Sequence, residues 1–286
     1  MSAVDPRMNE IVAADASREV ISDQFNFIEG PIWHPKEQHL TFSDIPENKL
    51  YRYQDGGAIS VYRDPSEMAN GNTYDQSGRI ISCLHGTSQV VRDDGNSVVT
   101  IASHFEGKEL NSPNDVVVAK DGSIYFTDPT YGRMGQHGIE RELQLDFRGV
   151  YRISPNGDLA LLASDFNQPN GLTLDLNESR LYVADTSNRH VRVFQLDQGT
   201  LSGGEIFCES PAPDGLKIDS LGNLYAGGPG GVHVYHHDGG THLGVIETPA
   251  FCANFAWGGS DYQTLFMTAS TTLFKIRVLV PGLPLF

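Results

Sequence analysis

The sequence has little cysteine and little basic charge. Its 286 residues include only three cysteines, Cys83, Cys208 and Cys252, whose odd number and wide separation argue against a disulfide framework or a zinc cluster. We therefore expect reduced, packed thiols. Asp and Glu number 36 against 20 Lys and Arg, which gives a formal net charge of −16. A protein that neutralises phosphates needs a basic stripe, so we expect neither a nucleic-acid partner nor an anionic membrane surface.

Long apolar runs are also missing. No window approaches the roughly 20 apolar residues that a membrane-spanning helix requires. The first twenty residues carry acidic side chains where a signal peptide would need an apolar core. These absences predict a cytoplasmic protein with no membrane partner.

What the sequence does contain is a repeat. Six short runs of β-branched and aromatic residues each follow a turn, at Leu40–Asp44, Ile80–Leu84, Ile124–Asp128, Leu181–Asp185, Leu224–Gly228 and Leu265–Ala269. About ten residues before each run stands an acid or an amide; these six anchor residues are Glu29, Asn70, Asn114, Asn170, Asp214 and Asn254. A period of about 40 residues or slightly more is typical of repeat architectures.

Each repeat has room for four strands and lacks helical periodicity. In the fourth repeat, residues 171–176, 181–185, 190–196 and 204–210 are apolar or alternating segments separated by turns. Six such units predict an all-β, six-bladed β-propeller with four antiparallel strands per blade, as a single domain over residues 1–286. The last repeat has only three strands, so we expect the N-terminal segment 18–25 to supply the fourth and close the last blade.

One interval between anchor residues is longer than the others, because residues 129–147 form a polar, Gly-rich insertion. It contains Tyr131, Arg133 and His137. Long loops on a regular scaffold are often functional, but such a segment can also only pad the edge of a blade. The sequence favours neither interpretation.

Equivalent positions of a propeller converge on its central channel, so the anchor residues would bring oxygen atoms together. Such ligands suit a hard divalent cation, Ca²⁺ best, with Mg²⁺, Mn²⁺ and Zn²⁺ as alternatives. The competing interpretation is that Asn-Gly, Asn-Asp and Asp-Gly are simply turn dipeptides. Two carboxylates in one channel repel each other unless a cation or proton intervenes. We therefore interpret Glu29, Asn170 and Asp214 as metal ligands, leave Asn114 open, and assign Asn70 and Asn254 to turns or the rim.

Five segments resemble one known family: residues 29–33 (EGPIW), 110–132, 145–153, 168–186 and 213–219 (PDGLKID). They look like the SMP-30/gluconolactonase/luciferin-regenerating family of six-bladed propeller hydrolases, and most like its bacterial gluconolactonase branch. The resemblance implies one divalent cation held by Glu29, Asn170 and Asp214, with Asn114 as a further ligand or a substrate contact. Animal members carry Arg where this sequence has Ser112, so the details of sugar recognition do not transfer.

The resemblance further implies hydrolysis of a small-molecule sugar lactone, with D-glucono-1,5-lactone as the expected substrate. Asp214 is the expected general base, and Asn114, Tyr131 and Arg133 are expected to contact the substrate. His85 could face the channel, but for a lone histidine we expect a packed, hydrogen-bonded role. Hydrolysis of another lactone, ester or phosphotriester, and a non-enzymatic binding propeller, remain alternatives. The sequence does not indicate an oligomeric state.

Overall fold

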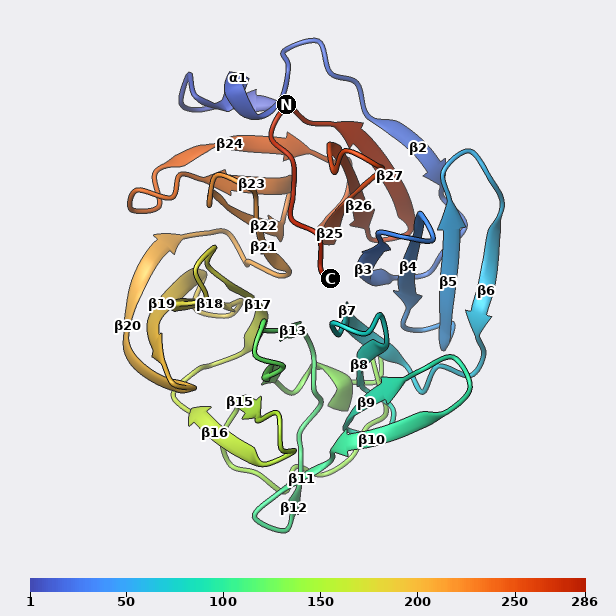
Figure 1. Ribbon diagram of the computed structural model, residues 1–286, viewed down its shortest axis with the longest axis vertical. Coiled ribbons are helices and arrows are strands. Elements are labelled where there is room, and N and C mark those ends of the chain that lie inside the picture. Colours follow the sequence, from blue (N-terminus) through green and yellow to red (C-terminus); the bar gives the residue numbers. More distant parts are fainter.

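The chain folds into antiparallel sheets arranged around a common centre. The computed structural model describes all residues, 1–286, and contains almost no helix: one α-helix, α1 (Met8–Ile11), and one 3-10 turn, η1 (Tyr131–Arg133). Figure 1 shows β3, β7, β13, β17, β21 and β25 nearest the centre, with the later strands of each sheet further out. The centre is therefore lined by one strand from every repeat predicted from the sequence.

Four of the sheets have four strands each and follow chain order from the inside outward. The first holds β3 (Ile28–His34), β4 (His39–Asp44), β5 (Lys49–Gln54) and β6 (Ile59–Arg63). The second holds β7 (Ala69–Tyr74), β8 (Ile80–Leu84), β9 (Gln89–Asp93) and β10 (Val98–Ala102). The third holds β13 (Val116–Val118), β14 (Ile124–Asp128), β15 (Gly149–Ile153) and β16 (Leu159–Ala163). The fourth holds β17 (Pro169–Leu174), β18 (Arg180–Asp185), β19 (His190–Asp197) and β20 (Thr200–Glu209).

The remaining large sheet has nine strands in two four-stranded parts. One part is β21 (Leu216–Ile218), β22 (Leu224–Gly228), β23 (Gly231–Tyr235) and β24 (His242–Glu247), with the short β1 (Ser2–Ala3) added at its edge. The other part is β25 (Cys252–Gly258), β26 (Thr264–Ala269), β27 (Thr272–Arg277) and β2 (Glu19–Ser22). A single pairing, Gly228 with Cys252, joins the two parts. A separate hairpin, β11 (His104–Phe105) and β12 (Lys108–Glu109), follows the second sheet.

The N-terminal segment pairs as the repeat pattern predicts. Val20 of β2 lies opposite Phe274 of β27, so the first and last parts of the chain share one sheet. Helix α1 adds buried Met8 and Ile11 to the core cluster that also contains Phe274. Both ends of the chain are therefore fastened to the same part of the molecule.

The core lies between neighbouring sheets. Trp33 of the first sheet stacks on Phe266 of β26 with ring centroids 5.5 Å apart, and Phe126 stacks on Tyr151 within the third sheet at 5.2 Å. Burying one large apolar side chain contributes about 1.5–3 kcal/mol. The three cysteines are free and buried, as predicted.

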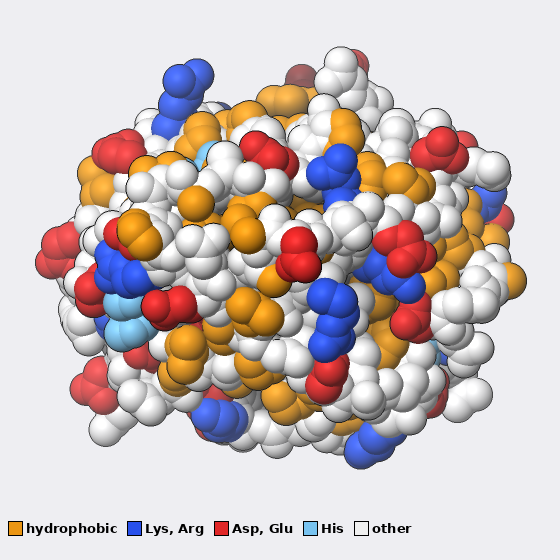
Figure 2. Space-filling view, turned by 90° about the horizontal axis from the view of Figure 1, so that it is seen from above, with side chains coloured by type: hydrophobic (Ala, Val, Ile, Leu, Met, Phe, Trp, Pro, Cys, Tyr) orange, Lys and Arg blue, Asp and Glu red, His pale blue; other side chains and the backbone are white.

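The outer surface mixes both signs of charge. On the face in Figure 2, Lys and Arg side chains lie among Asp and Glu side chains. Exposed pairs such as Arg277 with Asp261, 2.7 Å apart, contribute about 1 kcal/mol or less. None of the helices is both long and apolar enough to cross a bilayer.

Candidate functional site

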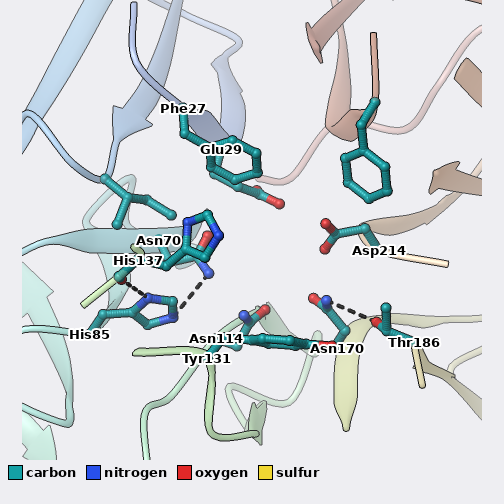
Figure 3. Close-up of a pocket in the computed structure, with 12 residues that line it drawn as sticks. Phe27, Glu29, Asn70, His85, Asn114, Tyr131, His137, Asn170, Thr186 and Asp214 are labelled. Atoms are coloured by element: carbon teal, nitrogen blue, oxygen red, sulfur yellow. Dashed lines mark hydrogen bonds between the residues drawn. The ribbon is translucent and has the colours of Figure 1, made fainter. Parts of the chain in front are cut away.

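A cavity of about 290 Å³ opens at the centre of the ring of sheets (Figure 3). Its walls combine acidic, amide, aromatic and imidazole side chains. The lining residues are Phe27, Glu29, Ile45, Asn70, His85, Asn114, Tyr131, His137, Asn170, Thr186, Asp214 and Phe251. Five of the six anchor residues predicted from the repeat are therefore in the cavity wall, and the sixth, Asn254, lies directly behind Glu29.

The anchor residues reach the cavity because they stand at the start of the innermost strands. Glu29, Asn70, Asn170 and Asn254 lie within β3, β7, β17 and β25, and in each of these strands the pairing register shifts beside the anchor residue. Such bulges bend a strand and re-aim its side chains. The turn interpretation of Asn70 and Asn254 thus differs from the structure, in which both belong to strands.

The glycines that follow the anchor residues allow close contact between neighbouring sheets. The N–H of Gly71 donates to the carbonyl of Asn114 in the next sheet at 2.8 Å, and the N–H of Gly171 donates to the carbonyl of Asp214 at 3.1 Å. A Cβ at Gly171 would overlap that carbonyl, and a Cβ at Gly71 would overlap the carbonyl of Asn114. The Asn-Gly dipeptides therefore let adjacent inner strands approach closely.

Glu29 is a buried carboxylate, 3 % exposed, and one of its two oxygens accepts hydrogen bonds from protein donors. Asn254 donates from Nδ2 to Glu29 Oε2 at 3.0 Å, and the N–H of Gly30 donates to the same oxygen. Glu29 Oε1 has no protein donor. Burial, with repulsion from Asp115, raises the pKa of Glu29 from 4.5 to about 7.

Asp214 faces Glu29 across the cavity, as Figure 3 shows. Burial raises its pKa well above the ordinary value, and the charges of Glu29 and Asp115 raise it further. Asp115 is itself buried, with a pKa raised by desolvation, while Lys217 opposes the shift for both Glu29 and Asp115. Lys217 thus acts on two of these three carboxyl groups, and their mutual repulsion is only partly compensated.

The amide of Asn170 has a fixed orientation. Its Nδ2 donates to Thr186 Oγ1 at 3.0 Å, and the Thr186 hydroxyl donates to the carbonyl of Pro213 at 2.7 Å. Because that hydroxyl hydrogen is already used, Thr186 can only accept from Asn170. Asn170 Oδ1 is therefore the end of the amide that remains for the cavity, on the same side as Asp214.

Asn70 and His85 form a second hydrogen-bonded pair in the cavity wall. For neither residue was a place in the cavity the interpretation preferred from the sequence. Asn70 Nδ2 lies 3.1 Å from His85 Nε2, and His85 Nδ1 lies 2.7 Å from the carbonyl oxygen of His137. His85 is hydrogen-bonded and buried, as expected, but it also lines the cavity. A repeat position signalled Asn70, whereas no motif marked His85.

The insertion at 129–147 gives its predicted residues different places. Tyr131 and His137 line the cavity, whereas Arg133 does not. Arg133 is 7 % exposed, and its guanidinium donates to the carbonyls of Leu110 (2.6 Å) and Glu142 (3.2 Å). Its Nη2 also pairs with Glu109 at 3.0 Å. Arg133 therefore ties the insertion to the preceding segment, in place of the substrate contact expected from the sequence.

An apolar wall, which the sequence did not indicate, completes the cavity. Phe27 and Phe251 directly precede the inner strands β3 and β25, and Ile45 directly follows β4; these positions carried no repeat signal. No Lys or Arg is among the lining residues. The cavity therefore combines an acidic centre with an apolar wall and has no Lys or Arg to pair with an anionic group.

The polar side of the cavity is rich in oxygen acceptors. Two carboxylates and the amides of Asn70, Asn114 and Asn170 converge on it, while no group of three or more His, Cys, Asp or Glu side chains forms a metal-binding cluster. Carboxylate and amide oxygens are ligands of hard cations. The same carboxylates can accept a proton from water held in the cavity.

Comparison with known proteins gives consistent matches. The model of the SMP-30/Gluconolactonase/LRE-like region matches residues 27–271. A gluconolactonase of Zymomonas mobilis is 31 % identical over 95 % of this chain and 84 % of its own length. A pentonolactonase of Haloferax volcanii is 28 % identical over 85 % of this chain and 81 % of its own. The solved structure of a gluconolactonase from Xanthomonas campestris has a TM-score of 0.90 and 31 % identity, covering 96 % of this chain and 94 % of that one.

Proposed function

The chain belongs to the SMP-30/Gluconolactonase/LRE-like family, and from this premise we propose that its central cavity hydrolyses a neutral sugar lactone. D-Glucono-1,5-lactone, opened to gluconate, is the proposed substrate. The observation that carries the proposal is the convergence of two carboxylates and three amides on one cavity that has no basic side chain. Two relatives that match most of the chain are a gluconolactonase and a pentonolactonase, which supports a lactone as the substrate class.

The dimensions and walls of the cavity support a single sugar ring. Ligand cavities usually measure roughly 300–1,000 Å³, and this one, at about 290 Å³, is at the small end. Phe27 and Phe251 offer apolar faces to the C–H side of a pyranose ring, while the amides offer partners for its hydroxyls. No Lys or Arg lines the cavity to pair with a phosphate, sulfonate or carboxylate on the substrate.

We propose one divalent cation, Ca²⁺ in the first place, with Mg²⁺, Mn²⁺ or Zn²⁺ as alternatives. Glu29, Asn114, Asn170 and Asp214 would hold it, since all four offer oxygen atoms and Glu29 Oε1 and Asn170 Oδ1 have no protein donor. The repulsion among Glu29, Asp115 and Asp214 favours a positive charge at this place. When bound, the cation supplies Lewis-acid stabilisation of the negative charge that develops on the lactone carbonyl oxygen.

The side chains of the cavity have separate roles in the proposed reaction. Asp214 takes the proton from the attacking water as the water oxygen bonds to the carbonyl carbon. The bond between that carbon and the ring oxygen breaks, and the proton passes to the departing oxygen, which becomes a hydroxyl. Asn114 and Tyr131 orient the lactone in the cavity, and Glu29, anchored by Asn254, keeps the second carboxylate in place.

We also propose that the two parts of the nine-stranded sheet are two separate blades joined by one pairing. With the other four sheets they would make a six-bladed propeller and a single domain, 1–286, carrying the loop at 129–147. The single pairing between Gly228 and Cys252 supports this division, because neighbours within each part share several pairings.

A titration of acid release at constant pH tests the function. We expect rapid hydrolysis of D-glucono-1,5-lactone and other neutral sugar lactones, and a kcat/KM at least about tenfold lower for a 6-phosphorylated lactone. The tenfold difference corresponds to about 1.4 kcal/mol of unfavourable interaction with the anionic group. Acid release from every lactone at the spontaneous rate would overturn the proposal. Hydrolysis of only a phosphotriester would move the activity to another ester class.

A further inference from the structure

Two buried polar atoms in the cavity wall have no hydrogen-bond partner. They are Asn70 Oδ1 and His137 Nδ1. Buried polar groups in folded proteins are nearly always paired, so an unpaired one calls for an explanation. Both residues line the same cavity, and Figure 3 shows them on the side opposite Asp214 and Asn170. The two atoms therefore mark a second polar region, across the cavity from Asp214.

The orientation of Asn70 follows from His85. The carbonyl of His137 can only accept, so the His85 nitrogen 2.7 Å from it, Nδ1, carries the hydrogen. Burial lowers the pKa of His85 to about 4, so its ring is neutral and Nε2 is an acceptor. The amide group 3.1 Å from Nε2 must then be the donating NH₂ of Asn70. Asn70 Oδ1 is consequently left over for a ligand.

The same histidine fixes the insertion. By donating to the carbonyl of His137, His85 fastens the loop directly above the second sheet. The imidazole of His137 packs against Phe27 with ring centroids 4.9 Å apart. His137 is therefore held by its backbone on one side and by its ring on the other, which keeps its Nδ1 at the cavity wall.

We propose that Asn70 Oδ1 and His137 Nδ1 together bind one hydroxyl group of the substrate, and that His85 is the positioning residue for both. The inference rests on the proposed function, because it assigns the hydroxyl to a sugar lactone. A hydroxyl has one hydrogen to donate and lone pairs to accept. The hydroxyl donates to Asn70 Oδ1, which can only accept, and it accepts from His137 Nδ1, so the proposal assigns His137 the neutral tautomer with its hydrogen on Nδ1.

A cation suits this pair of atoms less well. Burial lowers the pKa of His137, and the ring is neutral with a hydrogen on one nitrogen. A hydrogen on Nδ1 would point at a cation, whereas it completes the bonding of a hydroxyl. The two carboxylates are the anionic groups of the cavity, and Figure 3 places Asp214 with Asn170 across from this pair. The pair therefore lies across the cavity from Asp214, whereas Glu29 stands on β3, whose Gly30 contacts Asn70 of the neighbouring β7.

The test crosses protein variants with lactones. The rates of wild type, Asn70→Ala and His137→Ala are measured on D-glucono-1,5-lactone and on its 2-, 3-, 4- and 6-deoxy analogues. Each variant is expected to lower kcat/KM on the full lactone by about tenfold or more. On the one deoxy lactone that lacks the bound hydroxyl, each variant should lose less than about twofold. Gln136→Ala, an exposed neighbour on the same loop, serves as the control and should leave all rates unchanged.

Other outcomes separate the competing explanations. Uniform losses on every lactone by Asn70→Ala and His137→Ala would overturn this inference alone, and so would loss of bound cation in Asn70→Ala. A wild-type protein inactive on all sugar lactones would overturn the proposed function and this inference together. Asn70→Ser, which removes the carbonyl with less loss of packing, replaces Asn70→Ala if that variant does not fold.

The role of His85 is tested by adding His85→Ala to a double variant and, separately, to the wild type. Because His85 acts through Asn70 and His137, adding His85→Ala to the Asn70→Ala/His137→Ala variant should lower kcat/KM no further, within about twofold. In the wild-type background His85→Ala should reproduce most of the loss, with the same dependence on the deoxy lactone. An equal, additional loss in both backgrounds would overturn the positioning role.

Discussion

At the scale of single residues, the cavity is built from side chains whose orientation is set by a neighbour. Thr186 can only accept from Asn170, His85 can only accept from Asn70, and Asn254 donates to one oxygen of Glu29. In each case the oxygen left over is available to the cavity. The chemistry of the site therefore depends on residues behind the wall as much as on those in it.

Asp214→Asn tests the general base. The substitution keeps the shape and one oxygen, but an amide cannot take up the proton, so we expect kcat on D-glucono-1,5-lactone to fall by about 100-fold or more. Bound cation, measured in the same preparation, should fall much less than kcat. The exposed carboxylate variant Asp261→Asn is the control. A wild-type kcat in Asp214→Asn would remove Asp214 from the mechanism.

The raised pKa of Glu29 makes the stability of cation-free protein depend on pH. Between 4.5 and about 7, folded Glu29 keeps a proton that the unfolded chain has released, so the free energy of unfolding falls as pH rises through this window. At about 1.4 kcal/mol per pKa unit, the loss amounts to roughly 3–4 kcal/mol at most.

Urea midpoints in EDTA at pH 5.5 and pH 8 measure this effect. The midpoint of wild type should be lower at pH 8, and excess Ca²⁺ should raise it most at that pH. Glu29→Gln should show a smaller fall between the two pH values, which separates Glu29 from the other titrating groups. Equal falls in both proteins would contradict the assigned pKa shift.

At the scale of elements, the glycine that follows an anchor residue within a bulged inner strand contacts the next sheet. Gly171 lies against the carbonyl of Asp214, so this glycine supports both the packing of sheets and the position of the proposed general base. The same local feature recurs at Gly71 beside Asn114. Stability and function are therefore linked at these positions.

Gly171→Ala should destabilise the protein by about 1–3 kcal/mol, because overpacking a tight contact costs about this much, and kcat should fall because Asp214 is displaced. Gly57→Ala is a matched control, since its Cβ meets only the Gln54 residue of its own turn, at 3.2 Å. Thermal melting and the lactone assay check both variants. Equal melting temperatures would show that the sheets can separate without cost.

At the scale of the whole molecule, the N-terminal segment closes the ring. Removing residues 1–22 deletes β2 and the buried side chains of Met8 and Ile11, and it leaves the edge of β27 unpaired. We expect the melting temperature to fall by about 10 °C or more, since several kcal/mol of packing is lost. Removing only residues 1–3, which deletes the two-residue β1, is the control and should have a small effect. Equal melting temperatures for the two truncations would contradict closure by β2.

The sequence predicts much of this arrangement because a repeat makes equivalent positions visible. Glu29, Asn114, Asn170 and Asp214 stand at one position of the repeat, and the structure brings them to one cavity. The sequence assigns Asn70 to a turn or the rim, because an Asn-Gly dipeptide has the same local preference in a turn as in a bulge. Only the neighbouring strand reveals which of the two is used.

Residues outside the repeat carried no such signal. His137 and Arg133 share one insertion, but the loop conformation turns one toward the cavity and the other toward backbone carbonyls. Phe27 and Phe251 are single aromatic residues in connections, where nothing in the local pattern distinguishes a cavity wall from ordinary packing. Their positions depend on how distant segments meet, which a single sequence does not encode locally.

The measurement that tests the central claim most directly is the initial rate of D-glucono-1,5-lactone hydrolysis against bound divalent cation. Protein as purified, protein stripped with EDTA, and stripped protein titrated with Ca²⁺, Mg²⁺, Mn²⁺ or Zn²⁺ are compared at one pH. We predict one cation per chain, loss of activity on stripping, and a return of activity in proportion to bound cation. A stripped protein that keeps the full rate would contradict the claim that these oxygen ligands serve a cation-dependent lactonase.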